Sequence, residues 1–172
     1  DEYPYFSSFS DAWLQHCKDY VAKMIDMLDL DETSMVAEIA SNDGYLLQFV
    51  QAQKIPCFGV EPTASTAVAA RAKGIETIEE FFGVELAERL VGEGKSADLI
   101  AANNVLAHVP DINDFVSGFA MLLKNDGVAT FEFPHLMKMV VDRQFDTIYH
   151  EHYSYLSFST VVDIFRVNGL SV

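Results

Sequence analysis

The chain has 172 residues, half of them apolar, which suits one folded domain with a sizeable core and excludes a disordered or fibrous protein. Its formal net charge is −15, from 26 acidic and 11 basic residues, and no cluster of Lys and Arg interrupts the acidic sequence. A nucleic-acid backbone would be repelled, so we exclude nucleic acid as a main partner. The apolar runs are too short to span a membrane and the first residues lack an export pattern, so we expect a cytoplasmic protein.

The N-terminal region combines an aromatic stretch with a helical pattern. Residues 1–9 are rich in aromatic side chains and Ser, and we expect them to lie over a pocket or against a neighbour. Ser10 or Asp11 can cap a helix whose apolar positions recur at helical spacing from Trp13 to Leu28. We expect this helix to pack on a sheet, and we divide the chain into residues 1–32 and a core domain of residues 33–172.

After this region, apolar runs and amphipathic stretches alternate along the chain. The pattern predicts strands at 35–40, 55–60, 75–78, 97–103 and 127–133, and helices at about 44–53, 64–73, 83–92 and 111–124. Short links between such units predict an α/β fold: a doubly wound, mainly parallel sheet covered on both faces.

The C-terminal segment predicts one more helix and the start of a strand. Ser157 or Ser159 can cap the helix, and Asn168-Gly169 can end it. Residues 170–172 look like the opening of a further strand. We therefore expect a sheet truncated before its last strands, as in a fragment of a longer protein. The two cysteines, Cys17 and Cys57, lack metal-ligand spacing, and we expect both to be buried, with neither a zinc site nor a disulfide.

The stretch from Glu38 to Gly44 is the element around which the chain is organised. It follows an apolar run and precedes the apolar-periodic segment 45–50, so a strand, a tight turn of small residues and a helix start come in that order. Such an element places a nucleotide-like ligand at a helix N-terminus, where free amides favour acceptor groups. Only one of the usual three glycines is present, so an ordinary strand-to-helix turn is the alternative interpretation.

Polar residues also follow two other predicted strands. Glu61 ends the second strand, where a carboxylate can accept both hydroxyls of a ribose; the alternative is a solvated Glu that caps the next helix. Asn103 and Asn104 end the fourth strand, where their amides can bind a purine or an amino-acid group, and His108 follows in the loop. Each of these three residues, taken alone, is more often a turn former or a surface residue.

The segment 145–156 concentrates titratable and hydrogen-bonding groups. His150, Glu151 and His152 lie between Tyr149 and Tyr153, and in an extended segment Glu151 would project opposite the two imidazoles. Three interpretations stand: a metal site, a polar loop without chemistry, and a source of a general base, with a carboxylate that orients an imidazole and raises its basicity. We favour the general base.

Together, the three strand-end segments resemble the class I S-adenosylmethionine-dependent methyltransferase family over about residues 33–133. The stretch Glu38–Gly44 is similar to the family's first motif, with Ala40 and Asn42 in place of the first two glycines. The resemblance implies a Rossmann-like fold with S-adenosylmethionine as cofactor. The cofactor-binding residues that it implies are Glu38, Ala40, Ser41, Asn42, Gly44, Tyr45, Glu61, Pro62, Phe81, Phe82, Asn103 and Asn104. Phe81 or Phe82 would stack on the base, although a Phe pair is more often core.

The Tyr-His-Glu-His-Tyr segment, the first loop and the N-terminal aromatics resemble a narrower group, the C-methyltransferases of nucleotide-linked 4-keto deoxyhexoses. This resemblance implies His152 as the catalytic base and a sugar pocket lined by Tyr149, Glu151, His108 and Tyr3. Members of the group also carry an N-terminal zinc module and a second α/β domain, neither of which this sequence contains. If activity depends on those two domains, we expect this stretch of chain alone to be inactive.

The function that follows is methylation of the carbon next to the ketone of a nucleotide-linked deoxysugar, through an enolate. The partner is then a small molecule, and the sequence makes no prediction of an oligomeric state. One alternative is O- or N-methylation of another small molecule. A nicotinamide-dinucleotide enzyme is disfavoured by the absent Gly-x-Gly pair and by the Asn103-Asn104 strand end. A non-catalytic nucleotide-binding module is the last alternative.

Overall fold

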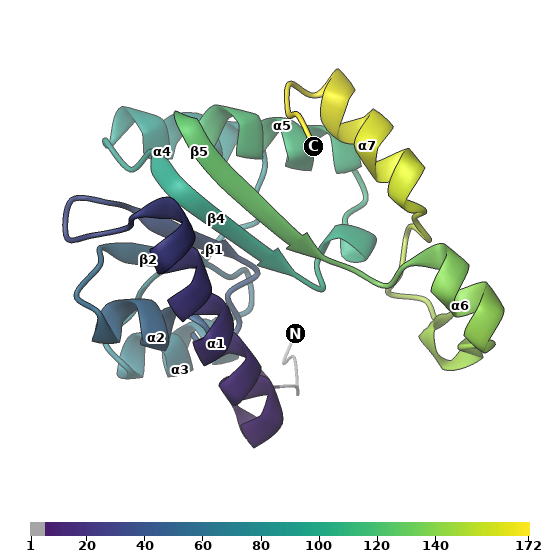
Figure 1. Cartoon of the computed structure of the whole chain (residues 1–172), viewed down its shortest axis with the longest axis horizontal. Coiled ribbons are helices and arrows are strands. Elements are labelled where there is room, and N and C mark those ends of the chain that lie inside the picture. The colour runs from purple at the N-terminus through teal and green to yellow at the C-terminus, as the bar shows by residue number, and fades with distance from the viewer. Residues whose placement is uncertain (1–5) are drawn as a thin grey trace.

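A computed structural model of the chain describes residues 6–172, which fold around one parallel sheet (Figure 1). The five strands lie in the order β3-β2-β1-β4-β5, and every neighbouring pair is parallel. Their bounds are β1 Val36–Ile39, β2 Cys57–Val60, β3 Glu76–Ile78, β4 Ala97–Asn103 and β5 Leu123–Glu132. Because all five strands run the same way, their carboxyl ends meet at one edge of the sheet, which is where such sheets bind ligands.

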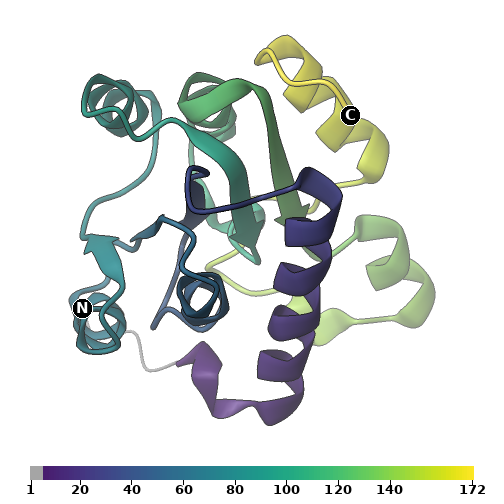
Figure 2. The same cartoon turned by 60° about the vertical axis from the view of Figure 1, so that its left-hand side comes forward.

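Helices cover both faces of the sheet, as Figures 1 and 2 show from two sides. One face packs against the first three helices, and the other packs against α4, α5 and α7. The helices are α1 Asp11–Leu28, α2 Leu47–Ala52, α3 Ala64–Ala72, α4 Val84–Gly92, α5 Ile112–Leu122, α6 Leu136–Asp142 and α7 Phe158–Val167. The predicted doubly wound, Rossmann-like fold is confirmed. Within the described residues, no helix has both the length and the apolar character that crossing a lipid bilayer would need.

Two apolar clusters hold the layers together. On the α4/α5/α7 face, Phe115 and Phe119 of α5 pack against Phe131 of β5 and Phe165 of α7. On the other face, α1 buries Cys17, Val21 and Met24 against β1, β4 and α2. Cys17 is therefore buried as predicted, whereas Cys57 is only half-buried, and both are free thiols.

The helix caps follow from local chemistry. The Ser10 hydroxyl accepts from the Trp13 amide at 3.3 Å and begins α1, and the left-handed Asp29 ends it. The Ser157 hydroxyl accepts from the Thr160 amide at 3.2 Å, so Ser157, and not Ser159, caps α7.

Two parts of the C-terminal half differ from the sequence-based expectation. Residues 170–172 form no strand, and Leu170 instead packs against the apolar cluster of the α5 face. Helix α6, which the apolar pattern did not reveal, stands out from the sheet with the turn that follows it (Figure 1). Its Val140 and Val141 are exposed, so no buried stripe of helical period marks it in the sequence.

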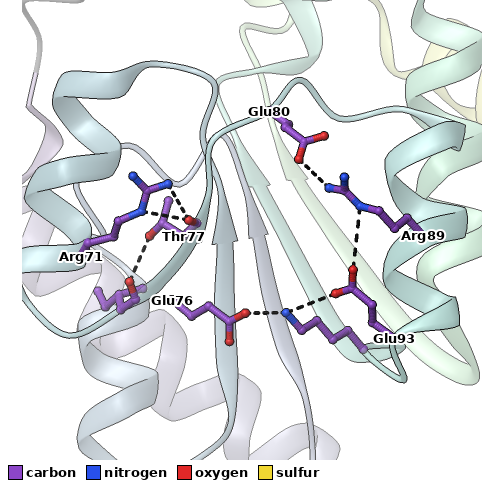
Figure 3. A network of polar contacts seen from close by, with 8 residues as sticks. Arg71, Glu76, Thr77, Glu80, Arg89 and Glu93 are labelled. Atoms are coloured by element: carbon purple, nitrogen blue, oxygen red, sulfur yellow. Dashed lines mark hydrogen bonds and ion pairs between the residues drawn. The ribbon is translucent and has the colours of Figure 1, made fainter.

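The edge strand β3 is tied to α3 by hydrogen bonds and to the turn after α4 by an ion pair (Figure 3). Arg71 of α3 donates to the Thr77 carbonyl oxygen of β3, at 3.1 Å from Nε and 2.9 Å from Nη2. Lys95 joins Glu76 of β3 to Glu93, which follows α4. The bonds from Arg71 occupy a backbone carbonyl of the edge strand that would otherwise be available to another chain.

Candidate functional site

A pocket of about 610 Å³ opens at the carboxyl edge of the sheet. Its size is that of a site for a nucleotide-sized ligand. It is lined by Ser7, Ser10, Trp13, Ala40, Asn42, Tyr45, Glu61, Pro62, Thr63, Phe81, Asn103, Asn104, Val105 and His108. The ends of strands β1, β2 and β4 thus contribute to one pocket, together with the beginning of α1.

The loop after β1 has the backbone of a glycine-rich loop, although two of its residues carry side chains. Ala40, Asn42 and Gly44 all lie in the left-handed region, with φ of 59°, 48° and 76°. This conformation costs more energy for Ala than for Asn, because the short Asn side chain can form hydrogen bonds with the neighbouring backbone. The Asn42 side-chain oxygen accepts from the amide of Asp43 at 2.9 Å and from that of Ser7 at 3.0 Å. The loop geometry of the glycine motif is therefore kept without the first two glycines.

Close packing explains why glycine is retained at two positions near this loop. A Cβ on Gly44 would lie 2.4 Å from Cδ1 of Ile75, and its positive φ disfavours any side chain. A Cβ on Gly59 of β2 would lie 2.3 Å from Oγ of Ser41. Gly44 and the buried Ser41 therefore shape the loop from behind, and neither lines the pocket.

Glu61 joins the end of β2 to the loop after β1. Its carboxylate accepts from the Asn42 amide at 2.9 Å through one oxygen and from the Thr63 amide at 2.9 Å through the other. The side chain is 5% exposed and lines the pocket. Each oxygen can accept a further bond, so the carboxylate has the free acceptors that the two hydroxyls of a ribose need.

Glu38 is buried below the pocket and does not line it, unlike the other acidic residue predicted to bind cofactor. Neither of its oxygens has a hydrogen-bond partner of normal geometry among residues 6–172. Burial raises the pKa of the Glu38 carboxyl well above its usual range, and the nearby Tyr45 hydroxyl and Leu47 amide oppose this only in part. Tyr45 separates Glu38 from the pocket, and its hydroxyl accepts from Asn103 at 3.4 Å.

The two phenylalanines that follow β3, Phe81 and Phe82, lie in different environments. Phe81 is 84% exposed and lines the pocket, so its ring is available to stack on a base. Phe82 packs edge-on against Phe115 and Phe119, at ring-centroid distances of 5.7 and 5.1 Å. The prediction that Phe82 contacts cofactor is therefore wrong, because its ring completes the core on the α5 face.

The N-terminal segment lies over the pocket, one of its two expected positions. Ser7 and Ser10 line the pocket, and Lys73 of α3 holds the segment by donating to Ser8 Oγ at 2.8 Å and to the buried Asp43 carboxylate at 3.2 Å. Tyr3 lies outside the described residues.

The Tyr-His-Glu-His segment is a turn and not an extended strand. The His152 amide donates to the Tyr149 carbonyl at 3.1 Å, which brings the two side chains together with ring centroids 4.4 Å apart. The amides of Tyr153 and Ser154 donate to the Ala107 carbonyl at 2.8 and 3.2 Å. The segment is thereby fixed against the loop after β4, at the edge of the sheet that holds the pocket.

His152 has a defined orientation. Its Nδ1 lies 2.7 Å from the Thr147 carbonyl oxygen, and because a carbonyl can only accept, Nδ1 carries a proton, so that in the neutral imidazole the lone pair is on Nε2. Its ring centroid lies 4.6 Å from that of His108, which lines the pocket. Burial lowers the pKa of His108, and the neighbouring His152 acts in the same direction while Glu151 opposes it.

Glu151 does not lie between the two imidazoles. The turn directs His150 outward, where Glu151 Oε1 is 4.0 Å from its Nε2, and the His150 side chain is 89% exposed. The expectation that Glu151 orients the base is therefore wrong, since the Thr147 carbonyl holds His152 instead. Among residues 6–172, no three His, Cys, Asp or Glu side chains are grouped closely enough to share a metal ion.

Several pocket residues escaped the sequence analysis. Trp13 belongs to the apolar positions that mark α1 in the sequence, yet it lines the pocket and its ring centroid lies 5.9 Å from that of Tyr45. Thr63 and Val105 also line the pocket, and their positions directly after the predicted site residues Pro62 and Asn104 could have indicated this. Thr147 and Glu132 gave no signal, because contacts that depend on folding alone bring them to His152 and Asn104.

A parallel sheet with a left-handed loop after β1, a buried carboxylate after β2 and an Asn pair after β4 defines a Rossmann-like nucleotide-cofactor domain. Comparison with protein families is more specific. Residues 37–129 match the family described as methyltransferase domain, which is more than half of the chain. The chain belongs to this family.

Individual relatives agree with this assignment. The chain is 32% identical over 170 residues to the C-methyltransferase NovU of Streptomyces niveus, an alignment that covers 99% of the chain and 40% of NovU. The chain therefore spans about two-fifths of the length of this curated relative. Its fold is similar to that of a putative sarcosine dimethylglycine methyltransferase from Galdieria sulphuraria (TM-score 0.68, 15% identity, 94% of this chain and 63% of that one). It is also similar to magnesium protoporphyrin IX methyltransferase from Synechocystis PCC 6803 (TM-score 0.64, 17% identity, 91% and 72%).

The cofactor of this methyltransferase domain is S-adenosylmethionine. The pocket fits it on three independent grounds. Glu61 offers acceptors beneath the loop, Phe81 offers an exposed aromatic face, and Tyr45 and Asn103 offer polar groups at the end of β4.

Proposed function

We propose that the protein methylates the carbon next to the ketone of a nucleotide-linked 4-keto deoxysugar, with His152 as the base. The observation that supports this most directly is the Nδ1 contact of His152 with the Thr147 carbonyl, since it leaves Nε2 free to take a proton. The relative NovU is named as a C-methyltransferase, which favours carbon over oxygen or nitrogen as the methylated atom. Action on a small molecule in the cytoplasm is part of the same proposal.

The cofactor end of the pocket would hold S-adenosylmethionine through the side chains that line it. Glu61 would accept from the ribose hydroxyls, and Phe81 would stack on the base. When bound, S-adenosylmethionine supplies an electrophilic methyl group on a sulfonium centre and leaves as S-adenosylhomocysteine.

The acceptor chemistry would fall to the histidine pair. Nε2 of His152 takes the proton from the carbon next to the ketone, and the electron pair of that C–H bond becomes the enolate. The Tyr149 hydroxyl, whose ring lies beside that of His152, can donate to the enolate oxygen, and His108 lies next to the base on the pocket side. Glu151 and Tyr3 complete the set that the family resemblance implies for the sugar pocket.

Deuterium exchange tests the base directly. The protein is mixed with a nucleotide-linked 4-keto deoxysugar and S-adenosylhomocysteine in D₂O, and exchange at the carbon beside the ketone is followed by NMR. We expect exchange in the wild type and a loss of about 10²- to 10⁴-fold in its rate in His152→Asn, because general base catalysis typically contributes that much. Methylation of oxygen or nitrogen requires no such exchange.

The matched control is His150→Asn, which removes an exposed imidazole two residues away. This variant should exchange at the wild-type rate. Equal rates in His152→Asn and His150→Asn would refute the role of His152, and absence of exchange in a wild type that still methylates the sugar would refute carbon methylation.

A further inference from the structure

A second, smaller pocket adjoins the cofactor pocket. Its volume is about 180 Å³, and it lies between α1 and β5. The lining residues are His16, Cys17, Tyr20, Leu46, Asn103, Thr130, Phe131 and Glu132. The two pockets share Asn103, and Trp13 of the larger pocket stacks on His16 of the smaller one with ring centroids 5.1 Å apart.

The order of the strands places this pocket at one end of the cofactor site. Phe81 follows β3 and Glu61 follows β2, so the nucleoside end of the site lies at the β3-β2 side of the sheet. Asn103 ends β4 and Glu132 ends β5, on the opposite side of β1. A ligand whose ribose is held at Glu61 and which extends past β1 therefore reaches the smaller pocket with its other end.

The smaller pocket favours positive charge. Glu132 accepts from Asn104 Nδ2 at 3.2 Å through Oε1, and no described residue donates to its second oxygen. Burial raises the pKa of the Cys17 thiol in the pocket wall to about 12, and Glu38 and Glu132 both add to the rise. Of these two acidic residues, only Glu132 lines the pocket. No Lys or Arg lines the pocket among the described residues.

We infer that this pocket takes the amino-acid end of S-adenosylmethionine, with the Glu132 carboxylate accepting a hydrogen bond from its α-ammonium group. Glu132 is thus a cofactor-binding residue that the sequence motifs do not mark. The Asn104 side chain would position the carboxylate through the Oε1 contact. The inference depends on the cofactor and not on the proposed sugar acceptor.

Calorimetry with two ligands tests it. S-adenosylhomocysteine carries the amino-acid end, and 5′-methylthioadenosine lacks it while keeping the same nucleoside. We expect Glu132→Gln to lower the affinity for S-adenosylhomocysteine by about 10- to 100-fold, which is the effect of losing a charge-assisted hydrogen bond. The affinity for 5′-methylthioadenosine should stay within about twofold of wild type. Glutamine keeps the shape of the side chain and an oxygen for Asn104.

The control is Glu88→Gln, which removes the same charge from an exposed position on α4 and should change neither affinity. A thermal melt of each variant verifies folding. An unchanged affinity for S-adenosylhomocysteine in Glu132→Gln, or an equal loss for both ligands, would overturn the inference. If the wild type bound neither ligand, the cofactor assignment would fail with it, whereas the proposed acceptor is tested separately by exchange at His152.

Discussion

In the loop after β1, which we call the cofactor loop (residues 40–44), the left-handed Ala40 is the residue whose conformation costs most. A non-glycine residue at φ 59° carries strain of about 1–2 kcal/mol, and glycine removes it at an entropic cost of about 0.4–1 kcal/mol in the unfolded chain. We expect Ala40→Gly to raise the free energy of unfolding by about 0.5–1 kcal/mol, measured by urea denaturation.

Asn42 is the matched case in which glycine should not help. Its side-chain oxygen accepts from two backbone amides, and Asn tolerates the left-handed region better than Ala. Asn42→Gly should lower the free energy of unfolding by about 1 kcal/mol. Equal stabilisation by both glycine variants would show that the hydrogen bonds of Asn42 contribute nothing.

The buried Glu38 makes stability depend on pH in an unusual direction. Its folded-state pKa lies above the usual value of 4.5, so the native state binds the proton more tightly than the unfolded chain does. Its contribution to stability is full below pH 4.5 and is lost as pH rises toward the folded pKa. The slope is at most about 1.4 kcal/mol per pH unit.

Glu38→Gln should therefore gain stability relative to the wild type as pH rises from about 4.5 to 8, in urea denaturation at each pH. Glu88→Gln, at an exposed glutamate, should follow the wild-type curve within about 0.5 kcal/mol. A constant difference between wild type and Glu38→Gln at every pH would contradict a raised pKa.

At the scale of elements, the start of α7 depends on one hydroxyl. Ser157→Ala removes the acceptor of the Thr160 amide and should lower the free energy of unfolding by about 1 kcal/mol. Ser159 lies within the helix, so Ser159→Ala should lower the free energy of unfolding by less than about 0.5 kcal/mol. The reverse order in chemical denaturation would assign the cap to Ser159.

How far the elements could be predicted depended on burial. Strands such as β1 and β4 are short, mainly buried and mainly apolar runs, and α5 buries one stripe at helical spacing, so the sequence marks each of them. Helix α6 exposes Val140 and Val141, so its apolar residues predict nothing about its period. The turn that joins Tyr149 to His152 was missed because a single backbone hydrogen bond sets it.

The site was predictable where strand ends supply it and not where side chains meet by folding. Glu61 and Asn103 follow buried runs, and parallel strands bring such ends together. Phe82 could not be told from Phe81, because neighbouring residues of a loop carry no period. Thr147 reaches His152 through its backbone carbonyl, which no residue type in the sequence reveals.

At the scale of the whole molecule, Lys73 fastens the N-terminal segment to the core. Its ammonium group pairs with the Asp43 carboxylate, whose other oxygen is buried without a partner among the described residues, and with Ser8. Lys73→Met leaves a buried carboxylate uncompensated, so we expect a loss of about 1–3 kcal/mol in urea denaturation and faster hydrogen exchange at Ser7 and Ser8.

The control for this variant is Lys138→Met, which breaks an exposed pair with Asp142 on α6 and should change stability by less than about 0.5 kcal/mol. If Lys73→Met were equally mild and left hydrogen exchange at Ser7 unchanged, the segment would be held by its other contacts.

The cofactor loop has a consequence for how this protein can diversify. A loop built from glycines presents only main chain to its ligand, whereas here two residues that carry side chains, Ala40 and Asn42, line the pocket. Both positions already tolerate a side chain at positive φ, so natural variation can exchange chemical groups beside the nucleoside without rebuilding the loop. Substitutions at these two positions are therefore the ones to make in order to bind analogues of the methyl donor that are enlarged on that side.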